Sequence, residues 1–397
     1  MFNPENYQLI KWTRLSMILS GVWNFPLSEN SFFQKVYEIY AVVMKCGYAV
    51  FFFNLFGEFL RLTFCNSEMA VIFASVGVLC NATKIAVKSL IYTRFDIFNL
   101  FEEVIEEEKQ IWQSGDQKII KMYKTKIRIC SIYILTLAIS TFVVVFLLML
   151  SGVFATFKLI QYNKLYNATL ETHFMYQTLF PLNKLDHLPL YFASQAFWSW
   201  LGITFNTMTQ GIFMTLLIYS ASQLKTLQIR MRGFVGNVET EALEPEEINE
   251  RNVILKELIQ DHIHIIEFVT YINRATRYPL LLEYLLTSFD IASVTVNLIR
   301  PSSERIWLVV YLSLLVMQIS LISWTCNEIR VQSVAIGDAL YESYWYLLNK
   351  EARFLVGLVI ARSQKPLSFT IGPFGTMTTG SALTVFKAAY SYVTLMK

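Results

Sequence analysis

Charged residues are scarce in this sequence. Asp, Glu, Lys and Arg together make up 16% of its 397 residues, whereas soluble domains contain about a quarter. Hydrophobic residues make up 54% of the chain. A sequence this long with so little charge is predicted to cross a membrane several times, which excludes a soluble globular domain.

Cysteine and catalytic motifs are also sparse. The five cysteines are scattered through apolar stretches, which fits neither a disulfide framework nor a metal site. Phosphate-binding, dinucleotide-binding and nucleophile-elbow glycine motifs are missing from the sequence. His262 and His264 stand two residues apart and so point to different faces of a helix. We expect no enzyme activity, no metal, no cofactor and no nucleic-acid partner.

The sequence also lacks a signal peptide. Residues 1–34 contain no uninterrupted apolar core after a basic start, so the first spanning helix is predicted to direct insertion. Seven stretches have the length and hydropathy of membrane spans. They run over residues 36–60, 68–91, 127–151, 188–221, 278–299, 305–329 and 375–396.

Basic residues predict how the spans are oriented. They gather before the first span and in the loops after the second, fourth and sixth spans, for example at Lys118, Lys121 and Lys124. The positive-inside rule then places the N-terminus in the cytoplasm and the C-terminus outside. The glycosylation sequon at Asn167 agrees, because it lies in a loop that this orientation places outside.

The predicted organisation alternates membrane and cytoplasmic parts. It comprises a cytoplasmic segment 1–35, four spans in 36–221, a cytoplasmic helical segment 222–277, two spans in 278–330, a second cytoplasmic segment 331–374 and a last membrane helix in 375–397.

Two cytoplasmic stretches are predicted to be amphipathic helices, over 245–275 and 351–362. A compact bundle below the membrane is favoured over a solvated helical loop. The acidic run from Glu102 to Glu108 is interpreted as a solvated helix face.

Ionisable residues inside spans are costly and therefore informative. Asp290 and Lys387 each lie about 12 residues into their spans and so at a similar depth. Three interpretations are open: an ion pair between them, a Lys387 that faces water, or a Lys387 that snorkels. Glu58, Lys84, Lys88 and Glu283 lie nearer helix ends and are expected to have no special role.

A ligand cavity is predicted in the outer half of the second, third, fourth and sixth spans, which are rich in aromatics with sparse polar atoms. Packing or lipid contact is the competing interpretation for each residue. The candidates are Phe73, Val76, Gly77, Cys80, Ser140, Val144, Leu148, Phe192, Gln195, Trp198, Tyr311 and Leu314.

The C-terminal third resembles the insect odorant receptors. The resemblance rests on Asp338-Ala-Leu-Tyr-Glu-Ser-Tyr-Trp345, Arg362-Ser-Gln-Lys-Pro366, Phe374 and Tyr390-Ser-Tyr392. It implies an odour-tuning subunit, since residues 222–277 look too short for the shared co-receptor of that family.

The resemblance also implies a mechanism. Receptors of this family are tetrameric, odorant-gated, nonselective cation channels in the dendritic membrane of sensory neurons, and tuning subunits assemble with the co-receptor. Their seventh helix is split into a cytoplasmic part and a membrane part that lines the pore. The resemblance assigns pore and gate positions to Val385, Ala388, Ala389, Tyr392 and Met396. A lysine suits a cation path poorly, so the resemblance favours Lys387 pairing with Asp290.

Two other classes are considered. A G-protein-coupled receptor also has seven spans, but it needs its N-terminus outside. It normally has an acidic-Arg-aromatic triplet after the third span and an Asn-Pro-x-x-Tyr turn in the seventh, and the sequence has neither. A transporter is less favoured, because we find no inverted repeat and no pair of broken spans.

Overall fold

The computed structural model describes residues 8–26, 30–65, 69–167, 174, 176–236, 244–299 and 305–396. The side chains of two predicted site residues, Phe73 and Met396, lie outside that description.

The described part of the chain is helical, which confirms the predicted all-α fold. Its helices are α1 (Lys11–Leu19), α2 (Ser31–Phe64), α3 (Met69–Arg94), η2 (Ile97–Asn99), α4 (Leu100–Gln113), α5 (Gln117–Tyr166), α6 (Leu188–Gly233), α7 (Pro245–Ile299), α8 (Arg305–Tyr341), η3 (Trp345–Leu347), α9 (Lys350–Ser363) and α10 (Thr379–Met396).

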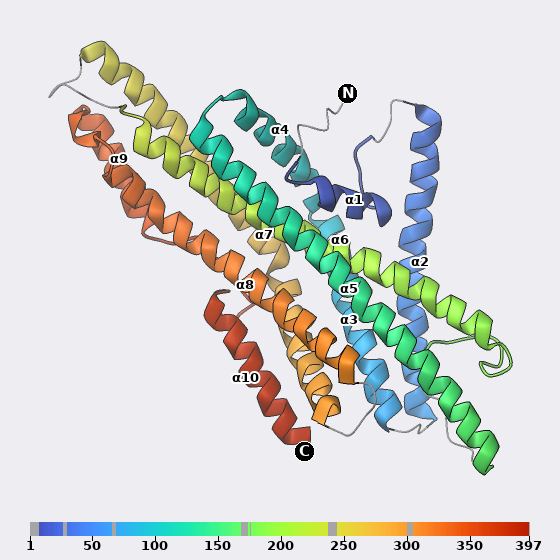
Figure 1. The fold of residues 1–397 in the computed structure, drawn as a ribbon. Helices are drawn as coiled ribbons and strands as arrows, with labels where there is room; N and C mark the ends of the chain where they lie inside the picture. The colour runs from blue at the N-terminus through green and yellow to red at the C-terminus, as the bar shows by residue number, and fades with distance from the viewer. Residues whose placement is uncertain are drawn as a thin grey trace.

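The long helices lie side by side, with α4 and α9 towards one end of the molecule and the last turns of α10 at the other (Figure 1). The end that carries α4 and α9 is called the inner end, because the loops predicted to be cytoplasmic lie there; the opposite end is the outer end. The predicted split of the last helix is present. Its first part, α9, packs against α8, and its second part, α10, packs against α7 and α8.

Five of these helices are long and apolar enough to cross a membrane by themselves: α2, α5, α6, α7 and α8. The predicted spans α3 and α10 are not among them. Each carries lysine within its length, Lys84 and Lys88 in α3 and Lys387 in α10. Such helices need protein or water beside their charges rather than lipid.

α6 is the central helix. In its most apolar stretch 78% of the residues are buried, against 22% in α2 and 28% in α5. α2 and α5 therefore present most of their apolar surface outward, as helices that face lipid do. α6 contacts α1, α5, α7 and α8, so it forms the centre of the hydrophobic core.

α7 is continuous where two elements were predicted. The sequence suggested a cytoplasmic helix over 245–275 and a separate span over 278–299, but one helix runs through Pro279. Proline removes a single helical hydrogen bond. Buried residues on both sides, among them Ile272 and Leu280, hold the helix together across this position. Residues 245–277 of the predicted cytoplasmic segment and the predicted span 278–299 therefore form one continuous helix.

The link between α9 and α10 is fastened to α7. The backbone and hydroxyl of Thr370 donate hydrogen bonds to Asn273 Oδ1 at 2.8 and 3.1 Å. The backbone N–H of Gly372 donates to the carbonyl of Arg277 at 3.0 Å. The link then turns back on itself, with Thr370 and Thr376 forming an antiparallel bridge. The start of α10 is therefore held by α7.

Candidate ligand-binding site

Two buried ion pairs join α3 to α7. Lys84 Nζ lies 2.8 Å from Asp290 Oδ2, and Lys88 Nζ lies 2.6 Å from Glu283 Oε2. All four side chains are at most 8% exposed. The lysines are one helical turn apart on α3, and the carboxylates are two turns apart on α7, so both pairs form along one contact between the helices.

The predicted pair of Asp290 and Lys387 is not formed. Asp290 binds Lys84, and Lys387 is exposed on α10 without an ion pair among the described residues. Similar depth in two spans did not imply contact, because the direction in which each side chain leaves its helix also decides its partner. The expectation that Lys84, Lys88 and Glu283 have no special role is corrected by the same contacts.

The two ion pairs form the middle of a row of buried polar contacts, which we call the polar ladder. This row continues towards the inner and the outer end of the molecule. At its inner end Gln210 Nε2 of α6 donates to Glu283 Oε1 at 2.6 Å. At its outer end, three residues before Lys84, Asn81 Nδ2 donates to the Tyr311 hydroxyl of α8 at 2.6 Å. α3, α6, α7 and α8 are thus tied together by buried polar contacts inside an apolar bundle. Hydrogen-bonded buried polar groups of this kind fix which helix faces meet.

Five of the predicted ligand residues lie on α3 and α8, close in sequence to Asn81 and Tyr311. Tyr311 takes part in the polar ladder directly, and Cys80 lies close enough to Asp290 and Lys84 to experience both charges. Gly77 lies one turn farther out on α3, and a Cβ built there would meet nothing within 4 Å. The other two are Val76, half-buried on α3, and Leu314, buried on α8.

The predicted residues of α6 do not join this group. Gln195 is 1% exposed and its Nε2 donates to the carbonyl of Tyr176 at 2.6 Å. Trp198 stacks on Phe51 of α2 with ring centroids 5.7 Å apart. The ring centroid of Phe192 lies 6.5 Å from that of Phe157 in α5. Each of these three side chains has a packing contact within the protein, and their assignment to the ligand cavity stays a prediction.

The predicted residues of α5 have packing contacts as well. The Ser140 hydroxyl donates to the carbonyl of Leu137 in its own helix, Val144 is buried in the hydrophobic core, and Leu148 is half-buried. None of these contacts connects α5 to the Asn81–Tyr311 group.

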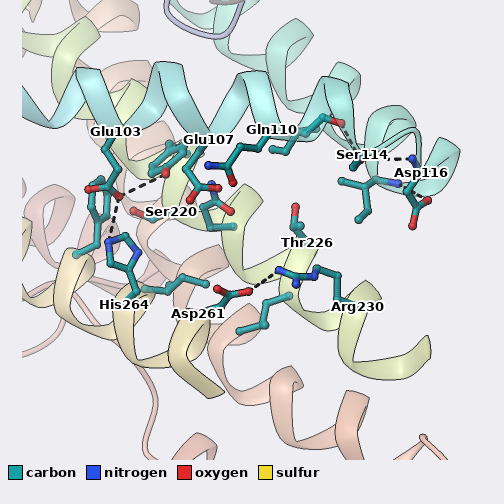
Figure 2. Close-up of a pocket in the computed structure, with 17 residues that line it drawn as sticks. Glu103, Glu107, Gln110, Ser114, Asp116, Ser220, Thr226, Arg230, Asp261 and His264 are labelled. Carbon is teal, nitrogen blue, oxygen red and sulfur yellow. Dashed lines mark hydrogen bonds and ion pairs between the residues drawn. The ribbon is translucent and has the colours of Figure 1, made fainter. Parts of the chain in front are cut away.

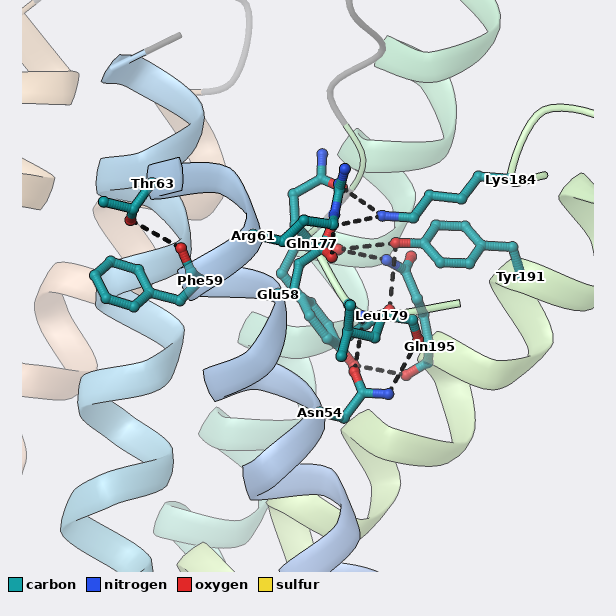
Figure 3. Close-up of polar contacts among 12 residues, drawn as sticks. Asn54, Glu58, Phe59, Arg61, Thr63, Gln177, Leu179, Lys184, Tyr191 and Gln195 are labelled. Carbon is teal, nitrogen blue, oxygen red and sulfur yellow. Dashed lines mark hydrogen bonds and ion pairs between the residues drawn. The ribbon is translucent and has the colours of Figure 1, made fainter. Parts of the chain in front are cut away.

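A second polar cluster closes the outer end between α2 and α6 (Figure 3). Glu58, 1% exposed, accepts hydrogen bonds at 2.8 Å from Arg61 and from Lys184. Asn54 exchanges two hydrogen bonds with the backbone of Leu179, at 2.9 and 3.0 Å. The loop before α6 is thereby tied to α2. The expectation that Glu58 has no special role is thereby corrected; its partner Lys184 lies 126 residues away in the sequence, which hides this contact from sequence analysis.

α10 leaves one face uncovered. Val385 and Ala389 are 4% and 3% exposed and pack into the chain, whereas Leu383 and Tyr390 are 60% and 70% exposed. Lys387 lies on the same exposed face. Two of the five predicted pore residues therefore do not lie on the free face of α10, while Ala388 and Tyr392 are at its margin.

The fold and the buried polar ladder together define a multi-pass helical membrane protein with a split last helix. The chain belongs to the 7tm odorant receptor family, whose model matches residues 68–390. Members of this family are ligand-binding receptors, not enzymes.

Individual relatives agree with this family. Odorant receptor 10 of Aedes albopictus is 28% identical over 189 residues, which cover 47% of this chain and 49% of that protein. Odorant receptor Or2 of Anopheles gambiae is 28% identical over 145 residues, covering 36% and 38%. The chain thus spans about half the length, or less, of the curated relatives it matches.

Solved structures show the same fold over the whole chain. The olfactory receptor OR5 of Machilis hrabei has a TM-score of 0.76 at 17% identity, with 99% of both chains covered. The same receptor in complex with eugenol has a TM-score of 0.73 at 15% identity, with 98% of both chains covered.

The α3–α7 contact yields a direct prediction. Lys88→Met leaves Glu283 buried without its countercharge, and we expect this to cost about 3–5 kcal/mol of stability. The double variant Lys88→Met/Glu283→Gln removes both charges and keeps an acceptor for Gln210, so we expect it to recover most of the loss. Thermal denaturation of the full-length protein in detergent measures both. Lys256→Met, at an exposed position of α7, is the control; a double variant no more stable than Lys88→Met contradicts the prediction.

Proposed function

We propose that this chain is the odour-tuning subunit of a ligand-gated, nonselective cation channel. It assembles with the family co-receptor in a tetramer in the plasma membrane of sensory-neuron dendrites. The observation that supports this most is the family match over residues 68–390, which includes most of the membrane helices. The fold shared with an olfactory receptor from end to end supports it as well.

The ligand is a small volatile organic molecule, bound beside the Asn81–Tyr311 contact at the outer part of α3 and α8. Three observations support this place. Gly77 has open space beside it, Tyr311 and Asn81 supply a hydroxyl and an amide, and the surrounding helices are apolar. Apolar pockets with a few placed polar groups are typical of small-molecule sites.

The pore is lined by the uncovered face of α10. In a pore built from the same helix of several subunits, each copy faces the central axis. The surface that faces the axis must be one that the helix's own chain leaves free. Leu383, Lys387 and Tyr390 have such surface, whereas Val385 and Ala389 do not. Gating is then a shift of population towards the state that binds the odorant more tightly. Because α7 holds the start of α10, a movement of α7 at the ligand site reaches the pore helix directly.

Asn167 is the proposed glycosylation site on the outer side. It is exposed at the C-terminal end of α5, with φ of 52°, and Thr169 of the sequon lies outside the described residues. An exposed helix end suits an acceptor asparagine.

Recording odour-evoked current in cells that express the chain with a co-receptor tests the ligand site. Gly77→Leu fills the open space beside α3, so we expect the half-maximal odorant concentration to rise by about tenfold or more, or the response to be lost. Ala196→Leu adds similar bulk at an exposed position of α6 and is the control. An unchanged dose–response curve of Gly77→Leu for a panel of volatile compounds would rule out this site. No current from the wild-type chain with any co-receptor would refute the channel itself.

Single-channel recording tests the pore face. A lysine on the pore axis repels permeating cations, so Lys387→Gln is expected to increase the inward cation conductance at low salt, where charge screening is weakest. Lys256→Gln removes a lysine from the exposed surface of α7 near the inner end and is expected to change nothing. Equal conductance in Lys387→Gln and the wild type would show that this face of α10 does not line the conduction path.

A further inference from the structure

A cavity of about 440 Å³ lies between α4, α6, α7 and the start of α5, at the inner end of the molecule (Figure 2). α4 contributes Glu103 and Glu107, one turn apart, and both side chains point from α4 towards α6 and α7 (Figure 2). The sequence analysis interpreted this acidic run as a solvated helix face. The structure corrects that interpretation in part: Glu102 and Glu106 are exposed, whereas Glu103 and Glu107 are half-buried in the wall of this cavity.

The charges that line the cavity do not balance. Its carboxylates are Glu103, Glu107, Asp116 and Asp261; its basic groups are Arg230 and His264. Arg230 forms an ion pair with Asp261, and His264 Nε2 lies 3.7 Å from Glu103 Oε1. The cavity therefore has an excess of negative charge, whether or not the histidine is protonated.

Two of these carboxylates have no ion pair among the described residues: Asp116, which caps the start of α5, and Glu107, which lies near His264 and Arg230 without pairing with either. Within the described residues the hydrogen-bond partner of Glu107 is an amide, Gln223 Nε2 at 3.4 Å. Burial, and then the charge of Asp261, raise the pKa of Glu107. Burial also raises the pKa of Glu103. Ionised carboxylates in such surroundings gain when a positive charge comes near them.

A second observation comes from α6. The Thr226 hydroxyl is buried and has no hydrogen-bond partner among the described residues, and the residue is 9% exposed. In Figure 2 this hydroxyl points into the space below Gln110 and Glu107. Buried polar groups almost always have partners, and a group without one calls for an explanation such as a bound ligand.

The rest of the lining is apolar. The rings of Tyr219 and Phe268 meet edge to face with centroids 5.2 Å apart, and Ile265 and Leu227 complete this side. Aromatic faces attract organic cations, and aliphatic side chains suit a hydrocarbon body. A bare metal ion fits less well, because the described residues contain no group of three or more His, Cys, Asp or Glu side chains able to hold one.

We propose that this inner cavity binds a small organic cation of the aliphatic polyamine class. An ammonium group would lie against Glu107 and Glu103, the Thr226 hydroxyl would hydrogen-bond to a second nitrogen, and the methylene chain would lie along Ile265 and Phe268. Because the cavity is formed by α4, α6 and α7 together, such a ligand would fasten α4 to the two long helices that continue to the outer half.

Titration calorimetry of the full-length protein in nanodiscs, with spermidine as the probe, tests this site. We expect saturable binding to one site per chain at neutral pH. Glu107→Gln removes a cavity carboxylate that has no ion pair among the described residues, and is expected to weaken binding by about tenfold or more. Glu106→Gln removes the same charge from the same helix at a side chain that is 58% exposed and paired with Lys109, so its affinity should equal that of the wild type. Glu103→Gln provides a second variant if Glu107→Gln fails to fold.

Several results would overturn the proposal. These are heat that does not saturate, equal affinity of the wild type and the cavity variant, or a loss in Glu106→Gln as large as in Glu107→Gln. Saturable calcium binding that depends on Glu107 would replace the organic cation by a metal. The measurement uses neither odorant nor current, so its outcome is independent of the proposed channel function.

Discussion

The neutralisation of two lysines on α3 is the constraint on which the rest of this structure depends. A helix that carries Lys84 and Lys88 cannot face lipid at that depth without a large cost in free energy. The carboxylates of Asp290 and Glu283 remove this cost only if α7 lies directly beside α3. These ion pairs therefore determine that α3 packs beside α7. The apolar surfaces of the helices alone would allow many arrangements.

Other parts of the molecule follow from this contact. Gln210 joins the central helix α6 to the inner pair, and Asn81 joins α8 to the outer end of the ladder through Tyr311. α7 also anchors the link before α10. The proposed ligand site and the proposed pore helix thus share α7 as a common neighbour, and α7 is the route by which the proposed gating would couple the two.

Much of the fold could be predicted from the sequence. Hydropathy identified the helices that became α2, α5, α6 and α8, and the C-terminal motifs identified the split of the last helix and the family. Side-chain partners could not be found in the same way. Asp290 was assigned to Lys387 by depth, but its partner Lys84 is 206 residues away and the pairing depends on the rotation of both helices.

The candidate site shows the same division. Tyr311 and Gly77 were predicted from the character of their helices; Tyr311 contacts Asn81, and Gly77 lies one turn before Asn81 on α3. Gln195 and Trp198 were predicted on the same grounds, from an aromatic-rich helix with few polar atoms. In the structure Gln195 donates a hydrogen bond to the carbonyl of Tyr176, and Trp198 stacks on Phe51. Glu107 seemed to belong to a solvated face, because a sequence does not reveal that α6 and α7 cover it. The type of a residue indicates whether its surroundings are apolar or polar. Which residues line the same cavity depends on how the helices pack in the folded protein.

A charge exchange between α3 and α7 tests the central claim most directly. Lys84→Asp and Asp290→Lys each place like charges together in the bundle, and each is expected to lower the thermal midpoint and the surface expression of the full-length protein strongly. The double variant restores an ion pair in reversed order, and the account predicts substantial recovery of both measurements. A double variant as unstable as either single one would contradict the claim that this ion pair determines how α3 and α7 assemble.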